Sequence, residues 1–141
     1  MRFCCFCVLA AALSAALPDH VSAQGAAPLC DPPQRARKVA EMMFGRDIGG
    51  HVGVSESAWK RFLAREITPR FPDGLTVTSA AGQWRDRSTG AIVNEPSKLV
   101  LIVLPGNADD QARLDAVVAA YKRRFHQQSV GVVEQSACVS F

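Results

Sequence analysis

The chain has 141 residues, of which 48% are hydrophobic and 21% are charged, and its formal net charge at pH 7 is +3. This length allows one domain with a hydrophobic core, and this composition is typical of a globular protein rather than a disordered chain. The small positive charge does not favour nucleic acid as a partner.

The N-terminus has the features of a secretory signal peptide. Arg2 precedes an apolar run over residues 3–17, and the small residues Ser22 and Ala23 suit cleavage by signal peptidase. The apolar run is shorter than the roughly 18 residues that a membrane span needs. We therefore expect residues 1–23 to be removed, leaving a soluble protein outside the cytoplasm with no membrane span.

Two cysteines remain once the signal peptide is removed. Of the five cysteines in the chain, only Cys30 and Cys138 follow residue 23. Two thiols at opposite ends of an exported chain predict a disulfide. This bond would tether an extended N-terminal arm, residues 24–37, to a single domain over residues 38–141.

The first elements of this domain are a strand and a helix. Residues 38–48 are mostly apolar and could form a short helix or a strand, and the Gly49-Gly50 pair that follows favours the strand. Ser55 is a good N-cap, and Pro69 ends the helix that begins there. Apolar residues recur at helical spacing between them: Trp59, Phe62, Leu63 and Ile67.

A long hairpin and a buried strand come next. An alternating run over residues 75–78 begins a strand that continues through residues 83–85 to a turn at 86–90. The return arm over residues 91–94 meets Pro96, which predicts a bulge or an edge position. Residues 99–104 are six consecutive apolar residues without alternation, which predicts a central strand covered on both faces.

The second half of the chain completes an α+β fold. Asn107 is a candidate N-cap for a second helix, and a last strand is expected over residues 130–139. The order β-α-β-β-α-β predicts a ferredoxin-like fold, an antiparallel four-stranded sheet with two helices on one face. The other face would then need a cover, which could be a second subunit in a homodimer, the hairpin or the N-terminal arm.

One cluster of polar and aromatic residues is a candidate ligand-binding site for a small anion or a planar partner. Arginine offers a rigid fork of donors, and tryptophan offers a stacking face. The alternative is structural: a buried Trp84 beside an ion pair between Arg85 and Glu95. The candidate ligand-binding residues are Arg46, Gln83, Trp84, Arg85, Glu95 and Lys98.

No sequence motif specifies a reaction. The spacing of Cys, His and Asp fits no metal site, no nucleophile elbow or phosphate loop is present, and no cofactor or catalytic residue is expected. Two classes of function remain open. A binding or interaction module of the cell envelope, with a small molecule or an envelope protein as partner, is favoured over a small dimeric α+β barrel enzyme similar to cofactor-independent monooxygenases.

Several strings together resemble one family over nearly all of the mature chain. They include Phe44-Gly45-Arg46, the segment from Thr68 to Thr76, Gly82-Gln83-Trp84-Arg85, Glu95-Pro96-Ser97-Lys98, Gln127-Gln128-Ser129-Val130 and the terminal Cys138-Val139-Ser140-Phe141. The chain resembles domain-of-unknown-function family 3574, small exported bacterial proteins. The resemblance implies a bacterial, periplasmic or secreted single-domain protein, and it implies no activity or catalytic residue.

Overall fold

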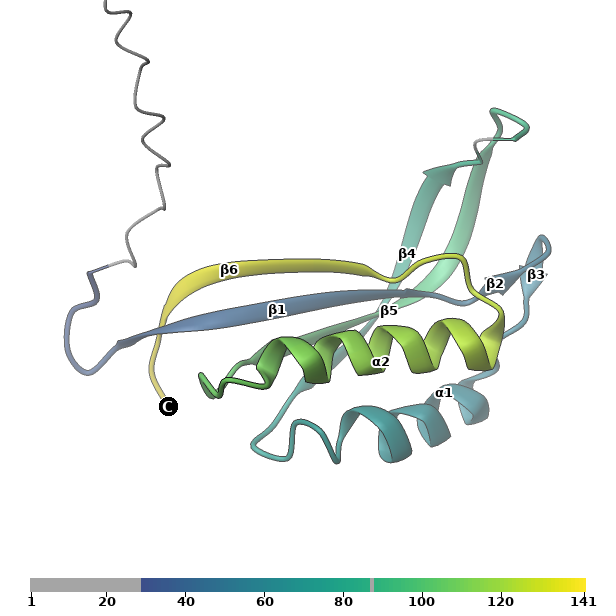
Figure 1. Cartoon of the computed structure of the whole chain (residues 1–141). Coiled ribbons are helices and arrows are strands. Elements are labelled where there is room, and N and C mark those ends of the chain that lie inside the picture. Colours follow the sequence, from purple (N-terminus) through teal and green to yellow (C-terminus); the bar gives the residue numbers. More distant parts are fainter. Residues whose placement is uncertain (1–28, 87) are drawn as a thin grey trace, which may run out of the picture.

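A four-stranded antiparallel sheet carries two helices on one face (Figure 1). This is a computed structural model, which describes residues 29–86 and 88–141; the predicted signal peptide lies outside them. The strand order β4-β5-β1-β6 puts the first and third long strands at the centre, so the predicted ferredoxin-like α+β fold is confirmed. The sheet consists of β1 (Arg35–Gly45), β4 (Thr76–Arg85), β5 (Ile92–Val103) and β6 (Gly131–Val139). The other elements are β2 (Asp47–Ile48), β3 (His51–Val52), α1 (Glu56–Phe62), the π-helical turn η1 (Leu63–Ile67) and α2 (Asp110–Phe125).

The first strand begins earlier than the sequence predicted. β1 starts at Arg35, within the segment expected to be an extended arm, and ends at Gly45 instead of residue 48. Residues 35–38 are polar or small, so they show no strand pattern, but they pair with residues 136–139 of β6. The predicted disulfide between Cys30 and Cys138 is present and holds this end of the ladder together, with the two Cα atoms 5.5 Å apart.

The helix boundaries follow local capping chemistry. The Ser55 hydroxyl oxygen accepts a hydrogen bond from the Ala58 amide at 3.2 Å, so the predicted N-cap of α1 is confirmed. The prediction of Asn107 as the N-cap of α2 was wrong, because α2 begins only at Asp110. The Asp110 carboxylate turns back and accepts hydrogen bonds from the amides of Gly106 and Asn107, both at 2.9 Å.

Aromatic side chains fill the space between the sheet and the helices. Phe44 projects from β1, and its ring centroid lies 4.8 Å from that of Tyr121 on α2. Phe62 links both helices, with its ring centroid 5.0 Å from Tyr121 and 5.7 Å from Phe125. Together with Trp59 these rings form a packed core whose edge-to-face contacts fix the helices on the sheet.

Pro96 marks the point where the hairpin leaves the sheet. The Arg46 amide donates a hydrogen bond to the Pro96 carbonyl oxygen at 3.0 Å, but Pro96 has no amide hydrogen to return. The Arg46 carbonyl oxygen instead accepts from the amides of Gly53 and Val54, at 3.0 and 3.1 Å. β5 therefore loses β1 as a partner here and continues paired with β4 alone, which is the edge position that a proline predicts.

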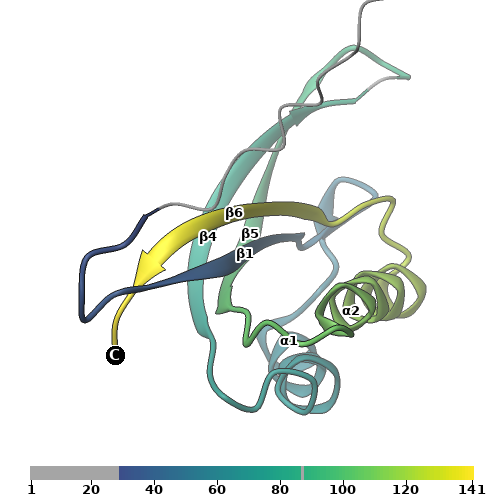
Figure 2. The ribbon, with the colours of Figure 1, turned by 60° about the vertical axis from the view of Figure 1, so that its left-hand side comes forward.

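Beyond Pro96, the two strands form a projecting hairpin, defined here as residues 82–86 and 88–95 of the described chain. It extends past the end of the sheet and bends away from the helices, toward the side of the sheet that they leave uncovered (Figures 1 and 2). Its register pairs Trp84 with Val93 and Arg85 with Ile92. A turn centred on Ser88, the middle of the expected turn at 86–90, would place Arg85 opposite Ala91, which is one residue away from the observed register.

The central strand β5 is covered on one face only. Val100 and Ile102 are fully buried against the helices, whereas Leu101 between them is 42% exposed on the opposite face. Burial on both faces, as the run of apolar residues predicted, is therefore not reached among residues 29–86 and 88–141 of one chain. Below, this uncovered side is called the open face. Its large apolar residues on the two central strands and β6 include Val39, Met43, Leu99, Leu101, Val103 and Val133, and Glu41 lies among them beside Leu101.

Candidate functional site

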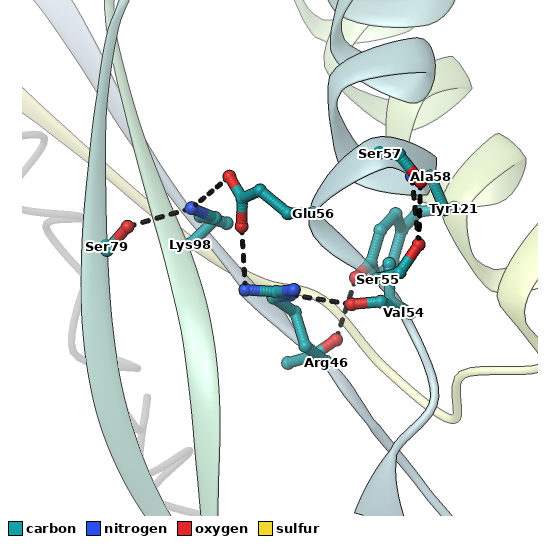
Figure 3. A network of polar contacts seen from close by, with 10 residues as sticks. Arg46, Val54, Ser55, Glu56, Ser57, Ala58, Ser79, Lys98 and Tyr121 are labelled. Carbon is teal, nitrogen blue, oxygen red and sulfur yellow. Dashed lines mark hydrogen bonds and ion pairs between the residues drawn. The ribbon is translucent and has the colours of Figure 1, made fainter.

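The six predicted site residues fall into three separate groups. Arg46 and Lys98 meet in one charged network, Glu95 lies on the opposite face of the sheet, and Gln83, Trp84 and Arg85 lie on the projecting hairpin. The network also contains two residues that the sequence did not single out, Glu56 and Ser79 (Figure 3).

Lys98 is the buried centre of this network. It lies on the helix-facing side of β5 and is only 5% exposed, which is unusual for a lysine. Its ammonium group donates hydrogen bonds of 2.8 Å to Glu56 Oε1 and of 2.8 Å to Ser79 Oγ (Figure 3). Burial of this charge is therefore compensated by a carboxylate and a hydroxyl.

Arg46 approaches the same carboxylate from the end of β1. Its Nε donates a 2.8 Å hydrogen bond to the Val54 carbonyl oxygen, and one terminal nitrogen lies 3.1 Å from Glu56 Oε2. The Arg46 side chain is only 12% exposed. Its hydrogen bond to Val54 connects it to the loop before α1.

Glu56 bridges the two cations from the first turn of α1. The hydrogen bond from Lys98 lowers the pKa of this carboxyl most, against a smaller opposing effect of burial, and the charges of Lys98 and Arg46 lower the pKa further. Its side chain is 50% exposed. A negative charge is also favourable at a helix N-terminus, so position and partners both keep Glu56 ionised.

Glu95 lies on the open-face side of β5, where it occupies the space above Gly45. A Cβ atom at Gly45 would lie only 2.6 Å from Glu95 Oε1, so the glycine makes room for this carboxylate. Glu95 Oε2 accepts a hydrogen bond from the Asp47 amide at 3.2 Å. Burial raises the pKa of Glu95, and the charge of Asp47 adds to the increase.

The hairpin residues divide between its two faces. Trp84 lies on the same side as the open face and is 40% exposed, while Gln83 and Arg85 lie on the other side and are exposed. Arg85 and Glu95 therefore project from opposite faces, so the alternative of an ion pair between them was wrong. The one-residue difference in register is the cause, since it moves a side chain to the other face.

Neither a metal nor a membrane is indicated by the described part of the chain. In residues 29–86 and 88–141, no group of three or more His, Cys, Asp or Glu side chains is placed to hold a metal ion. No helix within these ranges is long and apolar enough to cross a membrane.

The fold and the composition of this site define a small α+β protein of the ferredoxin-like class, with a charged network on one side of its sheet and exposed apolar side chains on the other. The chain belongs to the family described as protein of unknown function DUF3574, whose family model matches residues 39–141. The resemblance inferred from the sequence is thus confirmed.

Solved structures that are similar to this chain are distant from it in sequence. A phage SAM lyase in complex with S-methyl-5'-thioadenosine is 19% identical with a TM-score of 0.60, over 74% of this chain and 90% of that chain. The phage SAM lyase in the apo state is also 19% identical, with a TM-score of 0.58 over 80% of this chain and 92% of that chain. CutA from Synechococcus elongatus is 10% identical with a TM-score of 0.47, over 73% of this chain and 78% of that chain. No curated protein matches the chain.

Proposed function

We propose that the chain is a non-catalytic interaction module of the bacterial cell envelope that forms a homodimer through its open face. The observation that carries this proposal is the exposure of large apolar side chains on the uncovered side of the sheet. Met43 is 37% exposed, Leu101 is 42% exposed and Val133 is 49% exposed. Glu41 lies between Leu101 and Val133 on this face, so the apolar side chains surround one carboxylate. Exposed apolar surface of this extent marks interaction sites in soluble proteins.

The size of the open face suits a second copy of the chain. Strands lie about 4.8 Å apart and rise about 3.3 Å per residue, so the residues that the four strands contribute below the projecting hairpin present roughly 500 Å². Stable interfaces bury about 800 Å² per partner, and the projecting hairpin adds area beyond the sheet. A sheet packed face to face against its own copy would also give Leu101 the second cover that its strand pattern predicted.

Packing inside the domain favours an interaction module over the small barrel-type enzyme. A closed apolar cavity lined by Trp84 between the sheet and the helices would favour such an enzyme. Trp84 instead lies on the projecting hairpin, and Phe44, Phe62 and Tyr121 occupy the space between the layers. The likeness to phage SAM lyase concerns the fold, so we carry no substrate over to this chain.

An extracytoplasmic location is part of the proposal, and the disulfide between Cys30 and Cys138 supports it. Disulfides persist in oxidising compartments such as the bacterial periplasm. In the natural host we expect a chain that begins near Gln24 and is released with the periplasmic or secreted fraction. On a non-reducing gel this chain should migrate faster than the same chain after reduction. A chain of full length that is retained in the cytoplasm would contradict this part.

Self-association is tested by sedimentation equilibrium of the mature chain. We expect a dimer at micromolar concentration and a monomer for Leu101→Glu, which places a charge at the centre of the open face. Ile92→Glu is the matched control, because Ile92 is also exposed, at 55%, but lies on the far side of the hairpin. The control should remain a dimer. A wild-type chain that is monomeric at about 100 µM, far above the micromolar dissociation constants of weak specific complexes, would refute the proposal.

A further inference from the structure

The carboxylate of Glu41 lies in the middle of the open face. The strand ladder sets Glu41 opposite Leu101 of β5 on one side and opposite Val133 of β6 on the other. Its neighbours on the same face of β1 are Val39 and Met43, two residues before and after it. The Glu41 side chain is half-buried, and no hydrogen bond or ion pair joins it to another residue within 29–86 and 88–141. The four side chains around this carboxylate are therefore all apolar.

The other charges of the open face lie at its two ends. On the described strands they are Arg35 and Arg37 at the start of β1 and Glu95 at the base of the projecting hairpin. Arg37 is four residues from Glu41, a distance of about 13 Å along a strand. Since no described residue neutralises it, the Glu41 carboxylate relies on water for its solvation.

A second copy that covers the open face would remove this water. In a twofold dimer the same patch is buried on both copies, so two Glu41 carboxylates lose their solvation together. Burying an ionised carboxylate without a partner is costly, whereas the protonated acid is much less costly to bury because it carries no charge. Association is therefore coupled to the uptake of protons by the two Glu41 side chains.

We propose that Glu41 makes the self-association of this chain depend on pH, with the dimer favoured in acid. An ordinary glutamate titrates near about pH 4.3 in water, so the carboxylate of the free monomer is ionised at neutral pH. Lowering the pH toward that range reduces the free energy needed to protonate Glu41 and so strengthens the dimer. This inference rests on the proposed homodimer and adds the regulation of its interface.

The sign of the pH dependence distinguishes this proposal from an ion pair across the interface. If Glu41 instead paired with an arginine of the second copy, the dimer would favour the ionised carboxylate. Association would then weaken as the pH falls, which is the opposite of the proposed trend.

Sedimentation equilibrium of the mature chain between about pH 7.5 and about pH 5 measures this coupling. The dissociation constant should fall at least about tenfold over this range, because each dimer takes up protons at two sites. Glu41→Gln removes the titrating group and keeps the size of the side chain. This variant should dimerise more tightly than the wild type at pH 7.5, and its dissociation constant should change less than about threefold with pH.

Two further carboxylates serve as controls. Glu134 follows Val133 on β6 and therefore lies on the opposite side of the sheet, where its carboxylate is 4.0 Å from Lys38 Nζ. Glu134→Gln is the matched control and should keep the dissociation constant and the pH dependence of the wild type. Glu95→Gln removes the other carboxylate of the open face and should also keep the pH dependence.

The outcomes separate this inference from the proposed homodimer. A dimer whose dissociation constant is constant or rises as the pH falls would overturn the role of Glu41 and leave the homodimer standing. The same holds if Glu41→Gln keeps the pH dependence of the wild type, or if Glu95→Gln abolishes it. A chain that remains monomeric at about 100 µM at every pH in this range would overturn both.

Discussion

The Tyr121 hydroxyl donates a 2.8 Å hydrogen bond to the Gly45 carbonyl oxygen and so joins α2 to the last residue of β1. Tyr121 is fully buried, and burial raises the pKa of its phenol well above the usual value, so the group remains a donor. This bond fixes the strand end from which Arg46 and Asp47 leave the sheet.

Removing this hydroxyl should weaken the fold. Tyr121→Phe keeps the ring packing but leaves the Gly45 carbonyl oxygen without its partner, which costs about 1 to 3 kcal/mol of unfolding free energy. Urea unfolding of the variant and the wild type measures the difference. Equal urea midpoints for the variant and the wild type would mean that a water molecule donates to the Gly45 carbonyl oxygen in place of the hydroxyl.

Lys98 should behave as a structural residue. Lys98→Ala removes a buried stem and the donor to Glu56 and Ser79, and we expect a loss of about 2 kcal/mol in thermal or urea unfolding. Lys98→Met, which keeps the buried stem, should lose less, because replacing a buried charge by an apolar group of similar volume is often nearly neutral.

The control for Lys98 is Arg85→Ala, an exposed residue that should leave the melting temperature unchanged. At a ligand site, both variants would leave the fold stable and abolish binding. If Lys98→Ala leaves the unfolding free energy unchanged, the ligand-binding interpretation of the six predicted residues would stand again.

Glu95 should make the protein less stable as the pH rises. Its pKa is raised in the folded state, so folding favours the protonated form. The folded chain is then penalised when the pH rises from the ordinary carboxyl pKa through the raised value. Glu95→Gln keeps an acceptor for the Asp47 amide and removes this penalty.

We therefore expect Glu95→Gln to be more stable than the wild type at pH 7, with the difference shrinking as the pH falls below the ordinary carboxyl pKa. Unfolding free energies measured across this range check the trend. If the extra unfolding free energy of Glu95→Gln is the same at every pH, ionisation of Glu95 is not its source.

Reduction of the disulfide should weaken the fold strongly. The bond joins residues 108 positions apart, and closing a loop of this length contributes on the order of 4 kcal/mol in the chain-entropy model. Urea unfolding with and without reductant measures this contribution. The Cys30→Ala/Cys138→Ala double variant should match the reduced protein and should not respond to reductant.

The fold was predictable because its signals are local. The six apolar residues from 99 to 104 identified the central strand, Ser55 identified the start of α1, and two thiols in a chain expected to be exported identified the disulfide. The start of β1 was not predictable in this way, since residues 35–38 are held by pairing with β6, about 100 residues later in the chain.

The site was less predictable because its contacts are distant in the chain. Lys98 and Glu56 are 42 residues apart, and no local pattern relates a helix cap to a lysine on a later strand. The prediction of the hairpin register was wrong for a different reason. An error of one residue in the position of a turn moves every side chain beyond the turn to the opposite face. The acidic residue after the Ser55 cap was a usable signal for Glu56, because carboxylates are favoured in the first turn of a helix.

Pro96 divides β5 into two parts that should differ in how often they open. On one side of it the strand has hydrogen-bonded neighbours on both edges, and on the other side it has β4 alone. Amide hydrogens in residues 82–86 and 88–95 should therefore exchange with solvent through local opening, whereas those of residues 98–103 should require global unfolding. A proline at this position thus separates a rigid sheet from a segment that can rearrange without unfolding the rest of the domain.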